Sequence, residues 1–380
     1  MSSPEESKKY NNIKLAVGIS KTVISFVLLY LFVTLGYSNK LIIWINSYTS
    51  NDYLLLISFI ITTGVVSGVL FFPVNYYSGF YLEHKYDLSN QTFIKWILED
   101  LKGLLIFAAI GIPILLAFYF SLKTFGGIWW LPFAILLFIV SVLLARIVPV
   151  LILPLFYKLT PIDDEELKRR ITLLAIEAGV KVENVYRFDM SKNTKKANAA
   201  FTGIGKSKRI LLGDTLLDNY TKDEIETVIA HELGHYKKKH IIKNIVIGTV
   251  SSFLTLFLIA KLYDVSLTWF GFDMRTDIAA LPLLSLWAML IGLIQTPLGN
   301  ILSRKYEYEA DRYAVDVTKK PEAFVSTLRK LTSQNLGDEN PNPFVEWFFY
   351  SHPSINNRVN AIIDYSGSTV TSLQNLQTEQ

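Results

Sequence analysis

Long apolar runs dominate the pattern of hydrophobic and polar positions in this chain. Six runs reach roughly 20 residues, the length that an α-helix needs to cross the hydrocarbon core of a bilayer. They cover residues 16–37, 53–80, 102–121, 128–157, 241–262 and 279–302. The stretch from Trp129 to Leu144 contains no charged residue. The pattern predicts a mainly α-helical, multi-pass membrane protein, whose first run is a membrane helix and not a removed signal peptide.

The order of the runs predicts two domains. Residues 1–157 form an N-terminal membrane domain with four helices. Residues 158–380 form a second domain with the other two helices, near 241–262 and 279–302, and a polar C-terminal tail that from about residue 366 has the composition of a disordered segment. Lysine and arginine concentrate at one set of span ends, so the positive-inside rule predicts that both termini and the long polar segments face the cytoplasm.

The polar segment from Lys158 to His240 has the periodicities of a small α+β unit. Pro161 stands where a helix can start. Thr221 and Glu224 have the spacing of a capping box, which predicts a helix start just after Thr221. Three strand-like stretches predict a small sheet with a β-hairpin, at Asn184–Asp189, Ala199–Gly203 and Arg209–Gly213.

Composition narrows the chemistry that the chain can perform. Of its 380 residues 51% are hydrophobic and 18% charged, and the formal net charge is +4. Because lysine and arginine form no basic tract interleaved with aromatic residues, we expect no nucleic-acid partner. The chain has no cysteine, so any metal site must use histidine and carboxylate ligands.

The segment His231-Glu232-Leu233-Gly234-His235 is an HExxH motif on the helix that the capping box begins. Residues four apart lie one above the other on a helix, so both imidazoles can reach one zinc ion. The Glu232 carboxylate lies where it can accept the proton of a water that zinc activates, and can return it to the leaving amine. The motif predicts a zinc metalloprotease.

A catalytic zinc needs a third protein ligand, and the order of the membrane helices indicates where it lies. The fifth and sixth runs are antiparallel, so they bring the acidic segment after residue 302 back beside the HExxH helix. Glu307 and Asp311 are four residues apart, so one can bind zinc while the other orients a ligand, and Glu309 points elsewhere. The alternative is a solvated helix face whose acids pair with Arg304, Lys305 and Arg312.

A further candidate is Ser351-His352-Pro353, followed by Arg358 on a helix that Pro353 can begin. A lone His-Pro pair is often a cap or a turn. Near zinc, however, a histidine or arginine can donate to the oxyanion that forms during peptide hydrolysis. The residues themselves leave both interpretations open.

Ordered motifs run along nearly the whole chain besides HELGH and the acidic segment. They are Glu83-His84-Lys85-Tyr86, Asn90-Gln91-Thr92, Pro154-Leu155-Phe156, Thr160-Pro161, Asn198-Ala199, Ser303-Arg304, Asn335-Leu336-Gly337 and Ser351-His352-Pro353. Together they resemble the integral membrane zinc CaaX prenyl protease family, gluzincin-type endopeptidases of the endoplasmic reticulum and of bacterial membranes.

The resemblance implies a role for each matching residue. It makes His231, His235 and Glu307 the zinc ligands, Glu232 the general base, and Asp311 a residue that orients a ligand. It places Asn198 and His352 near the oxyanion, with Arg358 in support. It also implies that the strand with Ala199, Ala200 and Phe201 offers its edge to an extended substrate.

The resemblance also implies a fold and a function. Family members enclose a chamber with seven membrane helices, of which six are predicted here, and cut near a C-terminus that often carries an isoprenoid. We therefore expect one zinc ion per chain, a peptide or protein substrate with or without a lipid, and the bilayer as a partner. The first helix of the longer eukaryotic members and their long charged insertion before the HExxH helix have no counterpart here, which favours a bacterial or archaeal inner membrane over the endoplasmic reticulum.

Two other functions remain to be weighed. The first is a quality-control protease that cuts misfolded or non-prenylated polypeptides with the same site. The second is a transporter or scaffold with a structural zinc, which would need a fourth protein ligand. His240 is the nearby histidine that could supply it.

Overall fold

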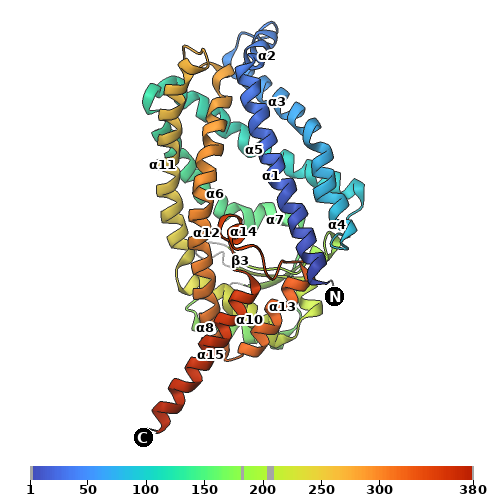
Figure 1. The fold of residues 1–380 in the computed structure, drawn as a ribbon. Helices are drawn as coiled ribbons and strands as arrows, with labels where there is room; N and C mark the ends of the chain where they lie inside the picture. Colours follow the sequence, from blue (N-terminus) through green and yellow to red (C-terminus); the bar gives the residue numbers. More distant parts are fainter. Residues whose placement is uncertain (1–2, 181–183, 203–208, 379–380) are drawn as a thin grey trace.

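The computed structural model describes residues 3–180, 184–202 and 209–378. Within these ranges, six helices are long and apolar enough to cross a membrane. They are α1 (Pro4–Thr34), α3 (Asp52–Asn75), α5 (Phe93–Phe125), α6 (Trp130–Ile147), α11 (His240–Trp269) and α12 (Pro282–Thr318). All six predicted runs fall in these helices or their short continuations, which confirms the multi-pass prediction. Figure 1 shows them as one bundle above the sheet.

Side chains on these helices stay exposed where a soluble protein would bury them. Leu104, Leu105 and Phe107 of α5 are 60, 63 and 72% exposed. Lipid is the solvent that such a surface requires, because a water-exposed apolar face of this extent would drive aggregation.

The two ends of the bundle are built differently. Toward the sheet, α3 passes through a π-helical turn (Tyr76–Tyr81) into α4 (Leu82–Lys85), and α6 through another (Val148–Ile152) into α7 (Leu153–Phe156). At the opposite end, Gly36 at φ 70° turns the chain from α1 into the short helix α2 (Tyr37–Asn46), which the apolar pattern did not predict. Figure 1 shows α2 far from the sheet.

A four-stranded sheet lies below the membrane helices, in the order β1-β2-β4-β3. Its strands are β1 (Leu159–Pro161), β2 (Asn184–Phe188), β3 (Ala199–Thr202) and β4 (Arg209–Gly213). β3 and β4 pair antiparallel, as the predicted hairpin requires, and the residues that join them lie outside the described ranges. β2 pairs parallel to β4. β3 is therefore an edge strand, which among the described strands pairs with β4 alone.

Two predictions about element boundaries were wrong. Pro161 lies in β1, and helix α8 (Glu165–Glu177) begins four residues later, where the Asp164 side chain accepts a hydrogen bond from the Leu167 backbone at 2.9 Å. An aspartate cap is a stronger start signal here than the proline. At the other end, α15 (Ile355–Thr378) continues as a helix through the tail that composition predicted to be disordered.

The remaining helices surround the sheet and form one apolar core with it. They are α9 (Asp214–Asn219), α10 (Lys222–Lys237) and α13 (Pro321–Gln334), whereas α14 (Pro343–Phe349) has no buried residue and packs on α12 outside this core. The core joins side chains from α8, β4, α10, α12, α13 and α15, including Ile171, Leu212, Ile225, Ala314 and Phe324. Because α12 is also a membrane helix, the membrane bundle and the lower unit share one packed body.

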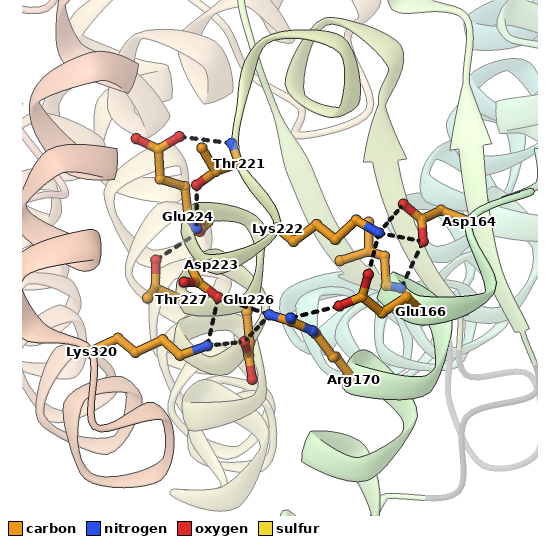
Figure 2. Close-up of polar contacts among 11 residues, drawn as sticks. Asp164, Glu166, Arg170, Thr221, Lys222, Asp223, Glu224, Glu226, Thr227 and Lys320 are labelled. Carbon is orange, nitrogen blue, oxygen red and sulfur yellow. Dashed lines mark hydrogen bonds and ion pairs between the residues drawn. The ribbon is translucent and has the colours of Figure 1, made fainter.

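The start of α10 is fixed by a complete capping box. The Thr221 hydroxyl accepts a hydrogen bond from the Glu224 backbone at 3.2 Å, and the Glu224 carboxylate accepts one from the Thr221 backbone at 2.9 Å (Figure 2). The same carboxylate accepts from Ser326 and Lys330 of α13. The predicted helix start is confirmed, and it is also a contact between two helices.

Charged side chains tie α10 to its neighbours on the surface (Figure 2). Lys222 pairs with Asp164 and Glu166 near the start of α8, and Arg170 of α8 pairs with Asp223. Lys320 pairs with Asp223 and Glu226 from the α13 side. Single exposed pairs contribute little stability, but this network orients the first turns of α10.

Thr221→Ala should lower the stability of the protein, because it leaves the Glu224 backbone N–H without its acceptor. Loss of such a cap costs about 1 kcal/mol, which corresponds to a fall of about 2–4 °C in melting temperature for a domain of roughly 150–250 residues. Thermal unfolding of the purified protein in detergent measures it. Thr221→Ser keeps the hydroxyl and should melt like the parent. Equal melting of all three proteins would contradict a stabilising cap.

Candidate metal centre

Three side chains predicted as metal ligands converge where α10 meets α12. The Nε2 atoms of His231 and His235 are 3.2 Å apart. Glu307 of α12 lies opposite them, with Oε2 at 3.5 Å from His231 Nε2 and Oε1 at 3.3 Å from His235 Nε2. One ligand atom from each residue lies within 4.8 Å of the other two.

Close approach of the two helices makes this geometry possible. Gly234 lies between the two histidines on α10, and a Cβ atom there would be 3.0 Å from the Ala310 Cα and 3.1 Å from its carbonyl oxygen. Ala310 on α12 is fully buried. A larger residue at either position would push Glu307 away from the histidines. The glycine of HELGH is thus a packing requirement, which the motif alone did not reveal.

The residues present fit a divalent metal ion. Glu307 is 5% exposed, and its Oε2 atom is buried without a hydrogen-bond partner among the described residues. A buried carboxylate oxygen without a partner is costly, and a cation at this position would satisfy it. Two imidazole nitrogens and one carboxylate oxygen are also the donor set of His₂Glu metal sites that keep a fourth position open.

His231 is held from behind by Asp311, the residue expected to orient a ligand. Its Nδ1 atom lies 2.9 Å from the Asp311 carboxylate, so Nε2 faces the other two ligands. Burial by itself would lower the pKa of His231, but hydrogen bonds to Asp311 and Glu307 outweigh it and raise this pKa to about 9. The imidazole thus sits in a strongly negative environment, which favours a cation at its Nε2.

Arg358 of α15 completes this side of the site. Its Nε and Nη2 atoms donate to the two oxygens of Asp311 at 2.8 and 2.5 Å, and its Nη1 lies 3.5 Å from Glu307. Burial opposes the charged form, but Asp311, Glu307 and Glu232 outweigh it and raise the pKa of Arg358. Because Glu307 and Asp311 are buried within this network, the alternative of a solvated acidic face is wrong for both.

His352 lies at the open side of the cluster. Its Nε2 is 3.5 Å from Glu307 Oε1, its side chain is 64% exposed, and Ser351 lies within hydrogen-bond distance of its Nδ1 at 3.0 Å. Arg304 of α12 holds the preceding helix α14 by donating to the backbone carbonyls of Glu346 and Tyr350. Arg304 therefore positions the His352 loop, a role that neither the Ser303-Arg304 motif nor the alternative of an acid pair had predicted.

Asn198 directly precedes the edge strand β3 beside α10, and the next three residues belong to that strand. The ring of Phe201 packs on Tyr236 of α10 at 5.6 Å. The Asn198 backbone accepts a hydrogen bond from Gly213, and its side chain is exposed. No hydrogen bond between described residues joins the Asn198 side chain to the three ligands. The structure thus brings the strand near the site but gives Asn198 no direct contact with it.

Asn335 fixes the chain just before this strand. Its Oδ1 accepts from the Ala197 backbone N–H at 2.9 Å, and its Nδ2 donates to the Ala197 carbonyl at 3.1 Å. The amide therefore pairs with Ala197 as a neighbouring strand would. The sequence placed Asn335 in a motif but predicted no role for its side chain.

Glu232 is half-buried on the next position of α10 after His231. No hydrogen bond within the described part of the chain engages its carboxylate, which leaves it able to accept a proton. Its charge contributes to the raised pKa of Arg358.

One expectation about a nearby residue was wrong, and the alternative of a fourth histidine ligand is disfavoured. Glu309 does not point away from the site, because its carboxylate lies 3.0 Å from Nε2 of His240. His240 in turn is directed at the far nitrogen of His235, with the two Nδ1 atoms 3.0 Å apart. Since both of its nitrogens are engaged, His240 does not close the site as a fourth ligand.

Two known families match successive parts of the chain. Residues 2–158 match the family described as CAAX prenyl protease N-terminal, five membrane helices. Residues 161–366 match Peptidase family M48. Within residues 3–158 the structure has four candidate spanning helices and the short α2.

Known proteins resemble the chain over most of its length. The uncharacterized metalloprotease YhfN of Bacillus subtilis is 32% identical over 357 residues, 93% of this chain and 84% of that protein. CAAX prenyl protease 1 of Saccharomyces cerevisiae is 34% identical over 323 residues, 79% of this chain and 70% of that protein. The crystal structure of S. mikatae Ste24p matches with a TM-score of 0.85 and 29% identity, over 94% of this chain and 88% of that one.

These matches span both the membrane helices and the segment that carries His231, His235 and Glu307. The chain therefore belongs to the CAAX prenyl protease family of M48 peptidases and is a multi-pass membrane metalloprotease.

Proposed function

We propose that this protein is a zinc endopeptidase that cuts peptide bonds near the C-terminus of membrane-associated polypeptides. The observation that carries the proposal is the His231–His235–Glu307 cluster, in which a buried carboxylate oxygen lacks a hydrogen-bond partner among the described residues and one side stays open near His352. When bound there, zinc lowers the pKa of water to about 7 and polarises a peptide carbonyl.

The chain's own side chains divide the work of hydrolysis. Glu232 takes a proton from the attacking water and transfers it to the nitrogen of the breaking peptide bond, so that the amine leaves neutral. His352, exposed beside Glu307, donates a hydrogen bond to the oxyanion. Asn198 reaches the same oxyanion once substrate is bound, and Arg358 holds Asp311 and thereby His231 in place.

The free edge of β3 binds the substrate backbone. Since Gly213 donates to the carbonyl of Asn198, the antiparallel alternation turns the Ala200 backbone toward β4 and the backbone groups of Ala199 and Phe201 toward the open edge. An extended peptide can pair there as an added strand beside α10.

The named relatives support a CaaX-type substrate. The chain aligns with CAAX prenyl protease 1 of yeast over 70% of that protein, across both the membrane and the metal-binding parts. A quality-control protease would use the same residues, so the two functions differ in substrate and not in mechanism. A structural zinc in a transporter or scaffold is disfavoured, because His240 is engaged with His235 and Glu309.

The site is proposed to face the cytoplasm of a bacterial or archaeal inner membrane. The support is the excess of lysine and arginine at the span ends that adjoin the sheet and the metal ligands.

Glu232→Gln should lower kcat for peptide cleavage by about 10²–10⁴-fold, because an amide cannot accept the proton. Bound zinc should stay at one ion per chain. The assay compares a quenched CaaX peptide, with and without a farnesyl group, with an unstructured control peptide, before and after chelator treatment. Cleavage of the farnesylated peptide alone supports CaaX specificity, and equal cleavage of all three supports quality control.

The matched control is Glu226→Gln on the same helix, which alters only the surface pair with Lys320 and Arg170. It should cleave like the parent. Unchanged cleavage by Glu232→Gln would contradict the assignment of Glu232 as the general base.

Ala199→Pro should raise KM without loss of folding, because proline removes one N–H from the free edge of β3 and leaves the pairing with β4 intact. Loss of one main-chain hydrogen bond, about 0.5–1.5 kcal/mol, corresponds to roughly a 2- to 10-fold fall in kcat/KM. Steady-state kinetics and melting temperature measure the two effects. An unchanged kcat/KM would argue against strand addition at this edge.

The absence of cysteine allows a direct test of orientation. Ser50→Cys, at the α2 end, should react with a membrane-impermeant maleimide in intact cells. Arg169→Cys, on α8, should react only after the membrane is made permeable. Both positions are exposed, so accessibility depends on the membrane side. The reverse pattern would place the metal centre outside the cytoplasm.

A further inference from the structure

Two side chains, His240 and Glu309, extend a series of hydrogen bonds that begins at Nδ1 of His235. His240 lies with Nδ1 at 3.0 Å from His235 Nδ1, and with Nε2 at 3.0 Å from the Glu309 carboxylate. We propose, given the zinc site assigned above, that His240 and Glu309 are positioning residues that hold His235 as a metal ligand.

The donor and acceptor roles in this series of hydrogen bonds follow from one condition, that Nε2 of His235 is the metal ligand. When Nε2 of His235 is a ligand, its proton must sit on Nδ1, so Nδ1 donates to Nδ1 of His240. His240 then accepts at Nδ1 and carries its proton on Nε2, which donates to the carboxylate of Glu309. Each atom has one role that its partner matches, and every imidazole is neutral, as metal binding requires.

Packing holds His240 in this orientation. It is 1% exposed, and its ring stacks on Tyr306 with centroids 4.1 Å apart and planes at 10°. Tyr306 directly precedes the ligand Glu307 on α12. The imidazole therefore cannot rotate away from His235 without breaking a contact next to the third ligand.

A strained turn brings His240 to this place. On one continuous helix, residues five apart point about 140° away from each other. Here Lys239 adopts φ 58°, a left-handed conformation that is costly for a residue with a Cβ. The turn separates α10 from α11 and brings the His240 side chain back to Nδ1 of His235. Strain at this point is consistent with a geometric requirement on the residue that follows it.

Each of the two histidine ligands is oriented by a carboxylate of α12. Asp311 holds His231 directly, and Glu309 holds His235 through His240. Glu307, Glu309 and Asp311 thus form one run on α12 that supplies a ligand and both orienting carboxylates. Residues that orient metal ligands in this way typically change metal affinity by about 10–100-fold when removed.

The test measures the zinc dissociation constant of the full-length protein in detergent, by competition between metal-free protein and a chromophoric chelator. Glu309→Gln and His240→Ala should each weaken zinc binding by about 10–100-fold. The double variant should bind no more weakly than His240→Ala, because the two residues act in series. The matched control is Asp316→Asn on the same helix, whose carboxylate contacts Tyr365, and it should bind zinc like the parent.

Chemical rescue separates positioning from general packing. Free imidazole should restore zinc affinity to His240→Gly, which leaves an imidazole-sized space, and should not restore it to Glu309→Gln. Melting temperatures identify a variant that fails to fold. If a histidine variant does so, the zinc dissociation constant of the isosteric Glu309→Gln tests the inference. Parent-like zinc affinity in folded Glu309→Gln would overturn the inference. Absence of zinc binding in the parent would instead defeat the proposed function itself.

Discussion

The contact between α10 and α12 is the constraint on which the rest of the site depends. Gly234 lets the backbone of α10 approach Ala310 so closely that a Cβ there would lie only 3.0 Å from the Ala310 Cα and would force the two helices apart. That approach sets Glu307 opposite His231 and His235, and it places Asp311 and Glu309 behind the two imidazoles. Because α12 begins inside the membrane bundle, the membrane and the metal centre are built on one continuous helix.

Charge balance in this contact explains why a cation belongs there. Glu307 and Asp311 are 5 and 2% exposed, and Arg358 is the one buried guanidinium beside them among the described residues. When His231 is neutral, as metal binding requires, two carboxylates against one fixed positive charge leave the pocket negative. A buried charge without compensation is strongly destabilising, on the order of 3–5 kcal/mol when a partner is lost. A divalent ion supplies the missing charge at Glu307 Oε2, which lacks a hydrogen-bond partner among the described residues.

Polar contacts also connect the first membrane helix to the substrate strand. Glu83 at the start of α4 accepts a hydrogen bond from Tyr10 of α1 at 2.5 Å and pairs with Lys14 and Lys196, each at 2.9 Å. Lys196 directly precedes Ala197, which Asn335 holds in place. The first membrane helix, the π-helical turn of α3 and the strand that is proposed to bind substrate are thus joined through one carboxylate.

The sequence by itself determined the elements that follow from local patterns. Apolar run length predicted all six membrane helices, the Thr221–Glu224 spacing predicted the start of α10, and alternation predicted the strands of the hairpin. Helical periodicity placed His231 and His235 on one face, and the antiparallel order of two spans indicated the segment with Glu307. Each of these depends on neighbours in the chain or on the membrane as a known solvent.

Only the tertiary structure decided which side chains support those ligands. Helical spacing suggested that Glu309 faces away from the site, but the left-handed turn at Lys239 places His240 between Glu309 and His235. The Asn335 clamp on Ala197 joins residues 138 apart, and Arg304 reaches carbonyls 42 and 46 residues on. Such contacts have no local signature, because they depend on how helices cross and where one residue reverses the chain.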